Sequence, residues 1–180
     1  MRRGPPPFGG PTETGLSDMI VRQSGRDHSP FKAHRLCEDC LADFKTIRDD
    51  FASLDDWEDR YRYVIELGHE LEPLSDAAHN DANKVRGCVS QVWLEREART
   101  GADGRTILRF RGDSDSHLVR GLIAIAIALF SDRAPEQILA VDAFGVFRAL
   151  GLEQHLTPQR SNGVRAMIER IRTDAAAVAA

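Results

Sequence analysis

The residue in this 180-residue sequence with the clearest potential for chemistry is a single cysteine, Cys88. Cys88 follows Gly87, and two cations, Lys84 and Arg86, lie within four positions on its N-terminal side. Cationic neighbours lower the pKa of a thiol and enrich the nucleophilic thiolate, and a glycine permits a tight path that would place the sulfur on a loop. The alternative is a small buried hydrophobe, because free cysteines are among the most buried residue types. Residue types and spacing leave both interpretations open.

The other two cysteines, Cys37 and Cys40, lie in a segment of different composition, residues 1–41. This segment is rich in proline and glycine and has few apolar residues at any regular period. Such a segment buries too little surface to offset the entropy of ordering, so we predict a flexible N-terminal tail. His28 and His34 lie near the Cys-x-x-Cys pair, but a closed zinc site needs four ligands. Incidental thiols are therefore favoured over a metal site.

Overall composition excludes several classes of protein. The hydrophobic content of 42% is enough for one core, and the net charge of −4 gives no electrostatic case for binding nucleic acid or an anionic membrane. The longest apolar run, residues 122–130, is too short to span a bilayer. Low cysteine usage fits a reducing compartment, and no apolar signal region follows Arg2 and Arg3. We therefore predict a cytoplasmic location.

Helices are predicted ahead of Cys88. Apolar residues at three- and four-residue steps from Phe44 to Leu54 predict an amphipathic helix, and a second stripe runs from Trp57 to Leu71. Asp55, with Glu58 three residues later, predicts a capping box for the second helix. Gly68 marks its predicted end.

A β-hairpin is predicted to start immediately after Cys88. Residues 89–97 and 105–111 both alternate between apolar and polar types, and a Gly-Ala-Asp-Gly turn at 101–104 lies between them. In the polar connection ahead of Cys88, His79 is predicted to be solvated.

The remainder is predicted to be helical. Residues 112–116 are expected to form a loop with N-cap side chains, and 117–130 are apolar nearly all round, as in a central buried helix. Thr157-Pro158 starts a last helix, and residues 176–180 are predicted to fray. The predicted fold class is α+β, with a small antiparallel sheet packed against several helices in one domain, residues 42–175.

Several kinds of chemistry lack support in the sequence. No glycine-rich phosphate loop follows a predicted strand, so a bound nucleotide is not indicated. Asp113 and Asp115 could attract a hard cation, but their position ahead of a helix favours capping. A lone thiol that holds or passes a group remains.

Two alternatives to that interpretation stay open. A metal or iron–sulfur scaffold using Cys88 normally needs three or four ligands, and the folded part offers one cysteine. A cysteine hydrolase needs a histidine to activate the thiol. Four histidines are candidates for this role, and none of them lies in a recognisable catalytic motif. They are His69, His79, His117 and His155.

Blocks spread over residues 44–172 resemble the SufE family of sulfur acceptors, in the family's order and spacing. The blocks are Trp57-Glu-Asp-Arg-Tyr61, Ile65-Glu-Leu-Gly68, Asn83-x-Val85-x-Gly87-Cys88-x-Ser90-Gln91-Val92-Trp93-Leu94, Gly112-Asp-Ser-Asp115, Val119-x-Gly121-Leu-Ile-Ala124 and His155-Leu-Thr-Pro158-x-Arg160-Ser. The sequence departs from the family at Val89, where glutamine is common. The segment 1–41 has no counterpart in the family's compact members.

The resemblance implies an IscU-like α+β fold and a definite role for Cys88. SufE-like proteins accept sulfane sulfur from the persulfide of a PLP-dependent cysteine desulfurase, usually of the SufS type, and stimulate its turnover. They carry the sulfur as a cysteine persulfide to an iron–sulfur scaffold such as SufBCD. Such a chain is a sulfur-transfer partner without independent turnover, and it binds no cofactor or metal itself, since the PLP resides on the desulfurase. Lys84 and Arg86 would help to hold the attacking thiolate.

The resemblance extends to positions whose roles are less specific. Asp113 and Asp115 match an acidic loop that helps to shape or shield the cysteine loop, and Arg160 matches an arginine that could reach this loop or the partner through its fixed fork of donors. For each of these, a cap or surface ion pair is an equal alternative. Gln91 and Trp93 are assigned to strand packing first and to partner contact second. A carried persulfide also needs shielding, so we predict a hydrophobic recess for Cys88 and a mobile loop over residues 83–89.

Overall fold

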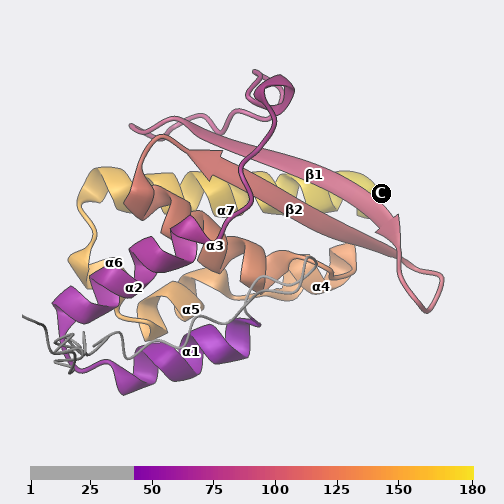
Figure 1. The fold of residues 1–180 in the computed structure, drawn as a ribbon. Coiled ribbons are helices and arrows are strands. Elements are labelled where there is room, and N and C mark those ends of the chain that lie inside the picture. The colour runs from indigo at the N-terminus through magenta and orange to yellow at the C-terminus, as the bar shows by residue number, and fades with distance from the viewer. Residues whose placement is uncertain (1–42) are drawn as a thin grey trace, which may run out of the picture. The chain divides into compact units, whose positions relative to one another are not determined.

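A computed structural model of the chain describes residues 43–180, so the predicted tail with Cys37 and Cys40 lies outside the described residues. The elements of the described part are shown in Figure 1. In chain order they are α1 (Phe44–Ser53), α2 (Trp57–His69), the short 3-10 helix η1 (Asp76–Ala78), β1 (Val92–Thr100), β2 (Thr106–Ser114), α3 (His117–Phe130), α4 (Pro135–Ala140), α5 (Ala143–Ala149), α6 (Leu152–His155) and α7 (Pro158–Ala179). The predicted α+β fold class is confirmed.

The sheet is an antiparallel hairpin in which β1 pairs with β2 from Val92 opposite Ser114 to Thr100 opposite Thr106. The predicted turn closes it, with Gly104 at a φ of +78° that favours glycine. One face is buried in the core through Val92, Leu94, Leu108 and Phe110. The hairpin therefore supplies one wall of the core and the frame from which the cysteine loop starts.

Helix α3 is the central element of the described part. It contacts α2, β2, α7 and α1, and eleven of its 14 residues are buried, as its all-round apolar sequence predicts. Its crossing with α2 is close because both helices carry a glycine there. A Cβ on Gly68 would lie 2.6 Å from the backbone nitrogen of Gly121, and one on Gly121 would overlap the carbonyl oxygen of Val64.

Helix α7 packs against α4 and α3, and in Figure 1 it runs along the hairpin. Its buried side includes Val164, Met167, Ile168 and Ile171. Residues 176–179 are helical, although a frayed end was predicted there. Ala175 is fully buried near this end, which gives the last turn a packed base.

Several predicted boundaries shift. The first strand begins at Val92, not directly after Cys88, because the segment before it stays a loop with Val89 80% exposed. The second strand continues through residues 112–114, which were predicted to be a loop. Glycine at 112 permits this close path, since a Cβ there would lie 2.6 Å from Ile123 Cγ2.

The start and end of α2 also differ from prediction. Asp56, not Asp55, is the N-cap, and its Oδ1 accepts a hydrogen bond of 2.9 Å from the backbone N–H of Glu58. The helix continues past Gly68 to His69, because Gly68 serves the crossing with α3 and does not end the helix.

Candidate functional site

Cys88 lies on the loop that precedes β1, where the loop touches α7. Gly87 has a φ of +94°, which a residue with a side chain adopts only with strain. The Cys88 thiol is half-buried, and its Sγ–H donates to the backbone carbonyl of Gly163 in α7 over 3.6 Å. The glycine-bearing loop predicted from the sequence thus holds the sulfur against a helix 75 residues further along the chain.

A pocket of about 450 Å³ opens beside the sulfur. Its apolar wall comes from Val119 and Leu122 of α3 and from Val164 and Met167 of α7. The first turn of α7 and its N-cap add polar groups, which are Thr157, Gln159 and Arg160. The predicted hydrophobic recess for the Cys88 side chain is present, whereas the mobility of residues 83–89 stays a prediction.

The electrostatics of Cys88 differ from the sequence-based prediction. Burial raises the pKa of the thiol above its ordinary value, because a thiolate loses hydration in an apolar recess. The hydrogen bond to Gly163 also favours a raised pKa, since only the protonated sulfur can donate to a carbonyl. The predicted lowering of the pKa by Lys84 and Arg86 is therefore wrong for this conformation.

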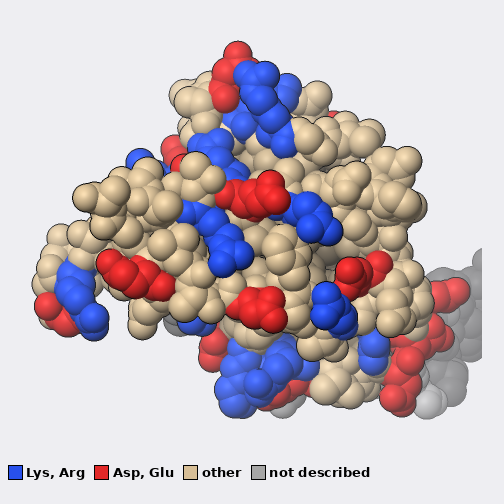
Figure 2. All heavy atoms as spheres, turned by 180° about the vertical axis from the view of Figure 1, so that it is seen from behind, with Lys and Arg blue, Asp and Glu red and all other residues tan. Residues whose placement is uncertain are grey.

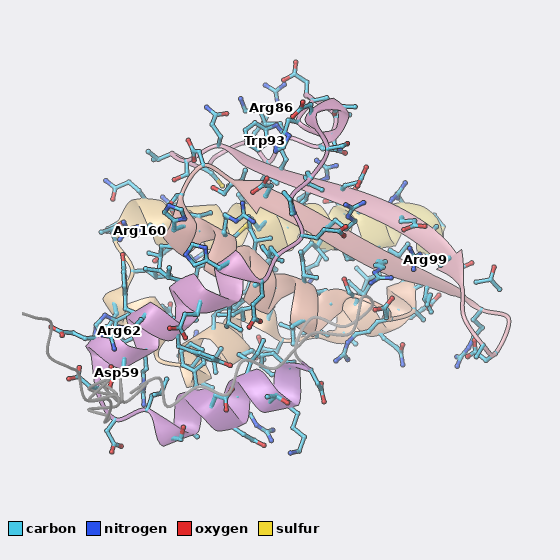
Figure 3. The ribbon with its side chains drawn as sticks, viewed as in Figure 1. Asp59, Arg62, Arg86, Trp93, Arg99 and Arg160 are labelled. Atoms are coloured by element: carbon cyan, nitrogen blue, oxygen red, sulfur yellow. The ribbon has the colours of Figure 1, made fainter. Side chains whose placement is uncertain are left out.

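Lys84 and Arg86 lie at the start of the cysteine loop. Lys84 forms an isolated antiparallel bridge with Trp93 of β1, and Arg86 is exposed. Figure 3 shows Arg86 and Trp93 at the same end of the hairpin. The backbone beside Lys84 completes this attachment, because Val85 N–H donates to the Val92 carbonyl over 2.9 Å. The N-terminal side of the loop is thus tied to β1.

The sequence favoured Asp113 as a cap of α3, but Asp113 does not cap this helix. Its side chain is 11% exposed, and the carboxylate accepts from Arg120 Nη1 over 2.9 Å. Arg120 also donates to the carbonyls of Gly68 and Leu71, over 3.1 and 3.0 Å. The other Asp113 oxygen lies 3.2 Å from His79 Nε2. Asp113 therefore joins β2 to the end of α2 and to the loop that carries His79.

His79 is correspondingly not the solvated loop residue that was predicted. Its ring lies edge-on to the Trp93 ring, with 4.7 Å between the centroids. Trp93 in turn lies opposite Asp113 in the β-ladder. His79 thus contacts both Trp93 and Asp113, and Trp93 also pairs with Lys84 at the start of the cysteine loop.

Asp115 ties the other end of the cysteine loop. Its Oδ1 accepts from the backbone N–H of Gln91 over 3.0 Å. The Asp115 N–H also donates to the Gln91 carbonyl over 3.4 Å. The N-cap of α3 is Ser116, whose side chain makes no capping bond. Of the two acidic positions, Asp115 contacts the cysteine loop directly and Asp113 acts through its neighbours.

The structure brings Arg160 to the pocket of Cys88. Figure 3 shows it near the start of α7. Gly163 was not singled out from the sequence, and neither were the lining residues of α3. The available signal for Gly163 was a glycine inside a predicted helix.

The surroundings of Cys88 also bear on the two alternatives, a cysteine hydrolase and a metal or iron–sulfur scaffold. Among the described residues, no histidine or carboxylate lines the pocket at Cys88. The ring of His155 stacks on that of Trp57 with 3.7 Å between the ring centroids, and the ring centroids of His69 and His117 lie 5.3 Å apart. Within residues 43–180, no three His, Cys, Asp or Glu side chains form a group that could hold a metal ion.

The described surface carries charges of both signs. Figure 2 shows acidic and basic side chains interspersed over the face opposite the view of Figure 1. Some of the exposed charges form ion pairs, such as Asp59 with Arg62 on α2. No helix in residues 43–180 is long and apolar enough to cross a membrane.

Comparison with known proteins places this fold and cysteine loop in a family. Residues 45–175 match the family model of SufE, described as an Fe-S metabolism associated domain. The chain belongs to the SufE family. An uncharacterized SufE-like protein of Rhizobium etli is 50% identical over 135 residues, covering 75% of this chain and 90% of that protein. One of Rhizobium meliloti is 51% identical over 129 residues, covering 72% and 91%.

A solved structure shows the same fold at lower sequence similarity. The solution structure of a hypothetical protein from Thermus thermophilus matches with a TM-score of 0.59 and 21% identity, covering 73% of this chain and 92% of that one. The SufE resemblance predicted from the sequence blocks is confirmed, and with it an association with iron–sulfur metabolism.

Proposed function

We propose that this SufE-family protein accepts sulfane sulfur on Cys88 from a PLP-dependent cysteine desulfurase of the SufS type, stimulates that enzyme, and passes the sulfur to a scaffold such as SufBCD. The observation that carries the proposal is the placement of Cys88. Its sulfur is half-buried beside an apolar-walled pocket, while the next residue, Val89, is 80% exposed. A carried sulfur needs both shelter and a route to its partner, and this loop supplies both.

The transfer is a thiol–disulfide type of exchange. The Cys88 thiol loses its proton to solvent, and the thiolate attacks the terminal sulfur of the donor persulfide. A new S–S bond forms on Cys88, the donor's S–S bond breaks, and the donor cysteine leaves as a thiolate that takes up a proton. One sulfur atom moves and no external oxidant or reductant is needed.

The described conformation is suited to holding and not to attacking. Burial and the Gly163 carbonyl both favour the neutral thiol, whereas attack requires the thiolate. Capture therefore requires the loop to swing Cys88 out of the recess, where water restores the ordinary pKa. Lys84 and Arg86 at the start of the loop would then lie near the thiolate and stabilise it. After capture, closure would shelter the persulfide.

The test mixes the purified protein with a SufS-type desulfurase and cysteine, followed by thiol alkylation and peptide mass analysis. We expect the mass of one added sulfur on Cys88 and faster desulfurase turnover. Cys88→Ser should abolish both effects, whereas the matched variant with Cys37→Ser and Cys40→Ser should retain both. Equal persulfide yield from Cys37 or Cys40 would refute the assignment. Stoichiometric iron or zinc in untagged protein would favour a scaffold instead.

A further inference from the structure

Gly163 occupies an unusual position for a glycine. It is buried inside α7, five residues after the helix starts at Pro158. Glycine in a helix interior is less favourable than alanine by about 1 kcal/mol. Its φ is not among the positive values of the described residues, so the backbone conformation does not require glycine. Another feature of the structure must account for the missing side chain.

The surroundings of Gly163 differ from those of the other two buried helical glycines at a close contact. Gly68 and Gly121 face backbone atoms at the crossing of α2 and α3, so they serve packing. A Cβ on Gly163 would meet only two atoms within 4 Å, which are Sγ of Cys88 at 3.3 Å and Cβ of Cys88 at 3.9 Å. Outside the backbone of its own helix, the absent side chain at this position therefore concerns Cys88.

We propose that Gly163 is a positioning residue whose missing side chain leaves room for the second sulfur of the Cys88 persulfide while the loop is closed. This inference rests on the proposed function. A persulfide extends the side chain by an S–S bond of about 2.05 Å, and its Sγ has no proton to donate to the Gly163 carbonyl. The Cys88 side chain must therefore move when it is loaded, and the open wall at Gly163 permits this movement within the pocket.

An added methyl group would remove that freedom. A carbon at 3.3 Å from Sγ is already closer than an ordinary van der Waals contact, so even the resting thiol would be displaced by a few tenths of an ångström. The longer persulfide has less room still. We expect the loaded loop of a Gly163→Ala variant to spend more time open, where reductants reach the terminal sulfur.

The experiment compares the wild type, Gly163→Ala and the matched control Asn162→Ala, which alters an exposed neighbour in the same helix. Each protein is loaded by the desulfurase with cysteine and, separately, by inorganic polysulfide. Dithiothreitol then releases the terminal sulfur as hydrogen sulfide and is itself oxidised to its cyclic disulfide. We expect the persulfide of Gly163→Ala to decay at least about threefold faster than that of the other two.

Two further measurements separate this role from a general effect on folding. The denaturation midpoint of Gly163→Ala should match or exceed that of the wild type, because alanine favours the helix. Iodoacetamide should alkylate its unloaded Cys88 faster, which keeps the idea testable if the variant loads poorly. An unchanged alkylation rate, or persulfide decay equal to the wild type, would overturn the inference. A wild type loaded only by polysulfide, and never by the desulfurase, would instead refute the proposed function.

Discussion

The pair formed by Asp113 and Arg120 should be a principal electrostatic contribution to the stability of the described domain. We predict that Asp113→Ala lowers the free energy of unfolding by about 2–3 kcal/mol. The variant removes a carboxylate whose side chain is 11% exposed and leaves the Arg120 guanidinium without its partner at 2.9 Å. Because water reaches the stranded charge only in part, the loss exceeds that of an ordinary hydrogen bond.

The magnitude follows from how much of the pair remains solvated. Breaking a fully buried pair costs about 3–5 kcal/mol. Here the Arg120 side chain keeps 22% exposure and two carbonyl acceptors, Gly68 and Leu71. The expected loss therefore lies below that range. Asp113 also holds His79, so part of the loss comes from that contact.

A double-mutant cycle isolates the pair. Urea denaturation of the wild type, Asp113→Ala, Arg120→Ala and the double variant should give a coupling energy of about 1–2 kcal/mol. The matched control is the exposed pair Asp59–Arg62 on α2, which has a similar distance of 2.8 Å but side chains 48% and 62% exposed. Its members are labelled in Figure 3. Coupling there should stay below about 0.5 kcal/mol. Equal coupling in the two pairs would refute the argument from burial.

Three other predictions concern the loop and the helix crossing. Since burial raises the folded-state pKa of Cys88, the rate at which the thiol is alkylated should keep rising through pH 9.0, the ordinary pKa of a thiol. The stability contributed by the neutral thiol is complete below the pKa of the unfolded state and falls as the pH rises above it. Cys88→Ser should abolish that fall. Asp115→Ala frees the Gln91 N–H, so Cys88 should be alkylated about two- to fivefold faster at constant pH. Gly121→Ala drives a methyl group into the Val64 carbonyl and should cost about 3 kcal/mol or more in urea denaturation.

The fold could be predicted from the sequence wherever one residue pattern dominates. The all-round apolar run of α3 and the turn at 101–104 each have one good structural solution, and both formed as expected. Boundaries were less certain because neighbouring side chains compete for the same role. Asp55 and Asp56 are both residues of a type that favours the N-cap, and the structure uses Asp56.

The sequence predicted that Cys88 lies on a glycine-bearing loop, but it did not predict the surroundings of the thiol. A thiol flanked by Lys84 and Arg86 suggests a low pKa when only sequence neighbours are considered. The recess that raises the pKa instead is built from α3 and α7, and no local pattern reveals which distant helix a loop touches. The same reason hides Gly163, which lies 75 residues from Cys88. Asp113 was misjudged because its partner Arg120 lies one turn into the helix that Asp113 was expected to cap.

Hydrogen bonds hold the cysteine loop at its two ends and at Cys88, and they differ in strength. One backbone hydrogen bond from Val85 to Val92 holds its first end, and Asp115 holds its last end at Gln91. Both attachments involve β1 or the residue before it, so they can persist while residues 86–90 move. Between them, Cys88 is joined to α7 by a sulfur hydrogen bond of 3.6 Å, which is weak beside an N–H···O bond. Val89 is 80% exposed already and loses little burial on opening. These contacts are compatible with the loop motion proposed above, because the bonds at the base of the loop can stay intact while only the weak bond of Cys88 breaks.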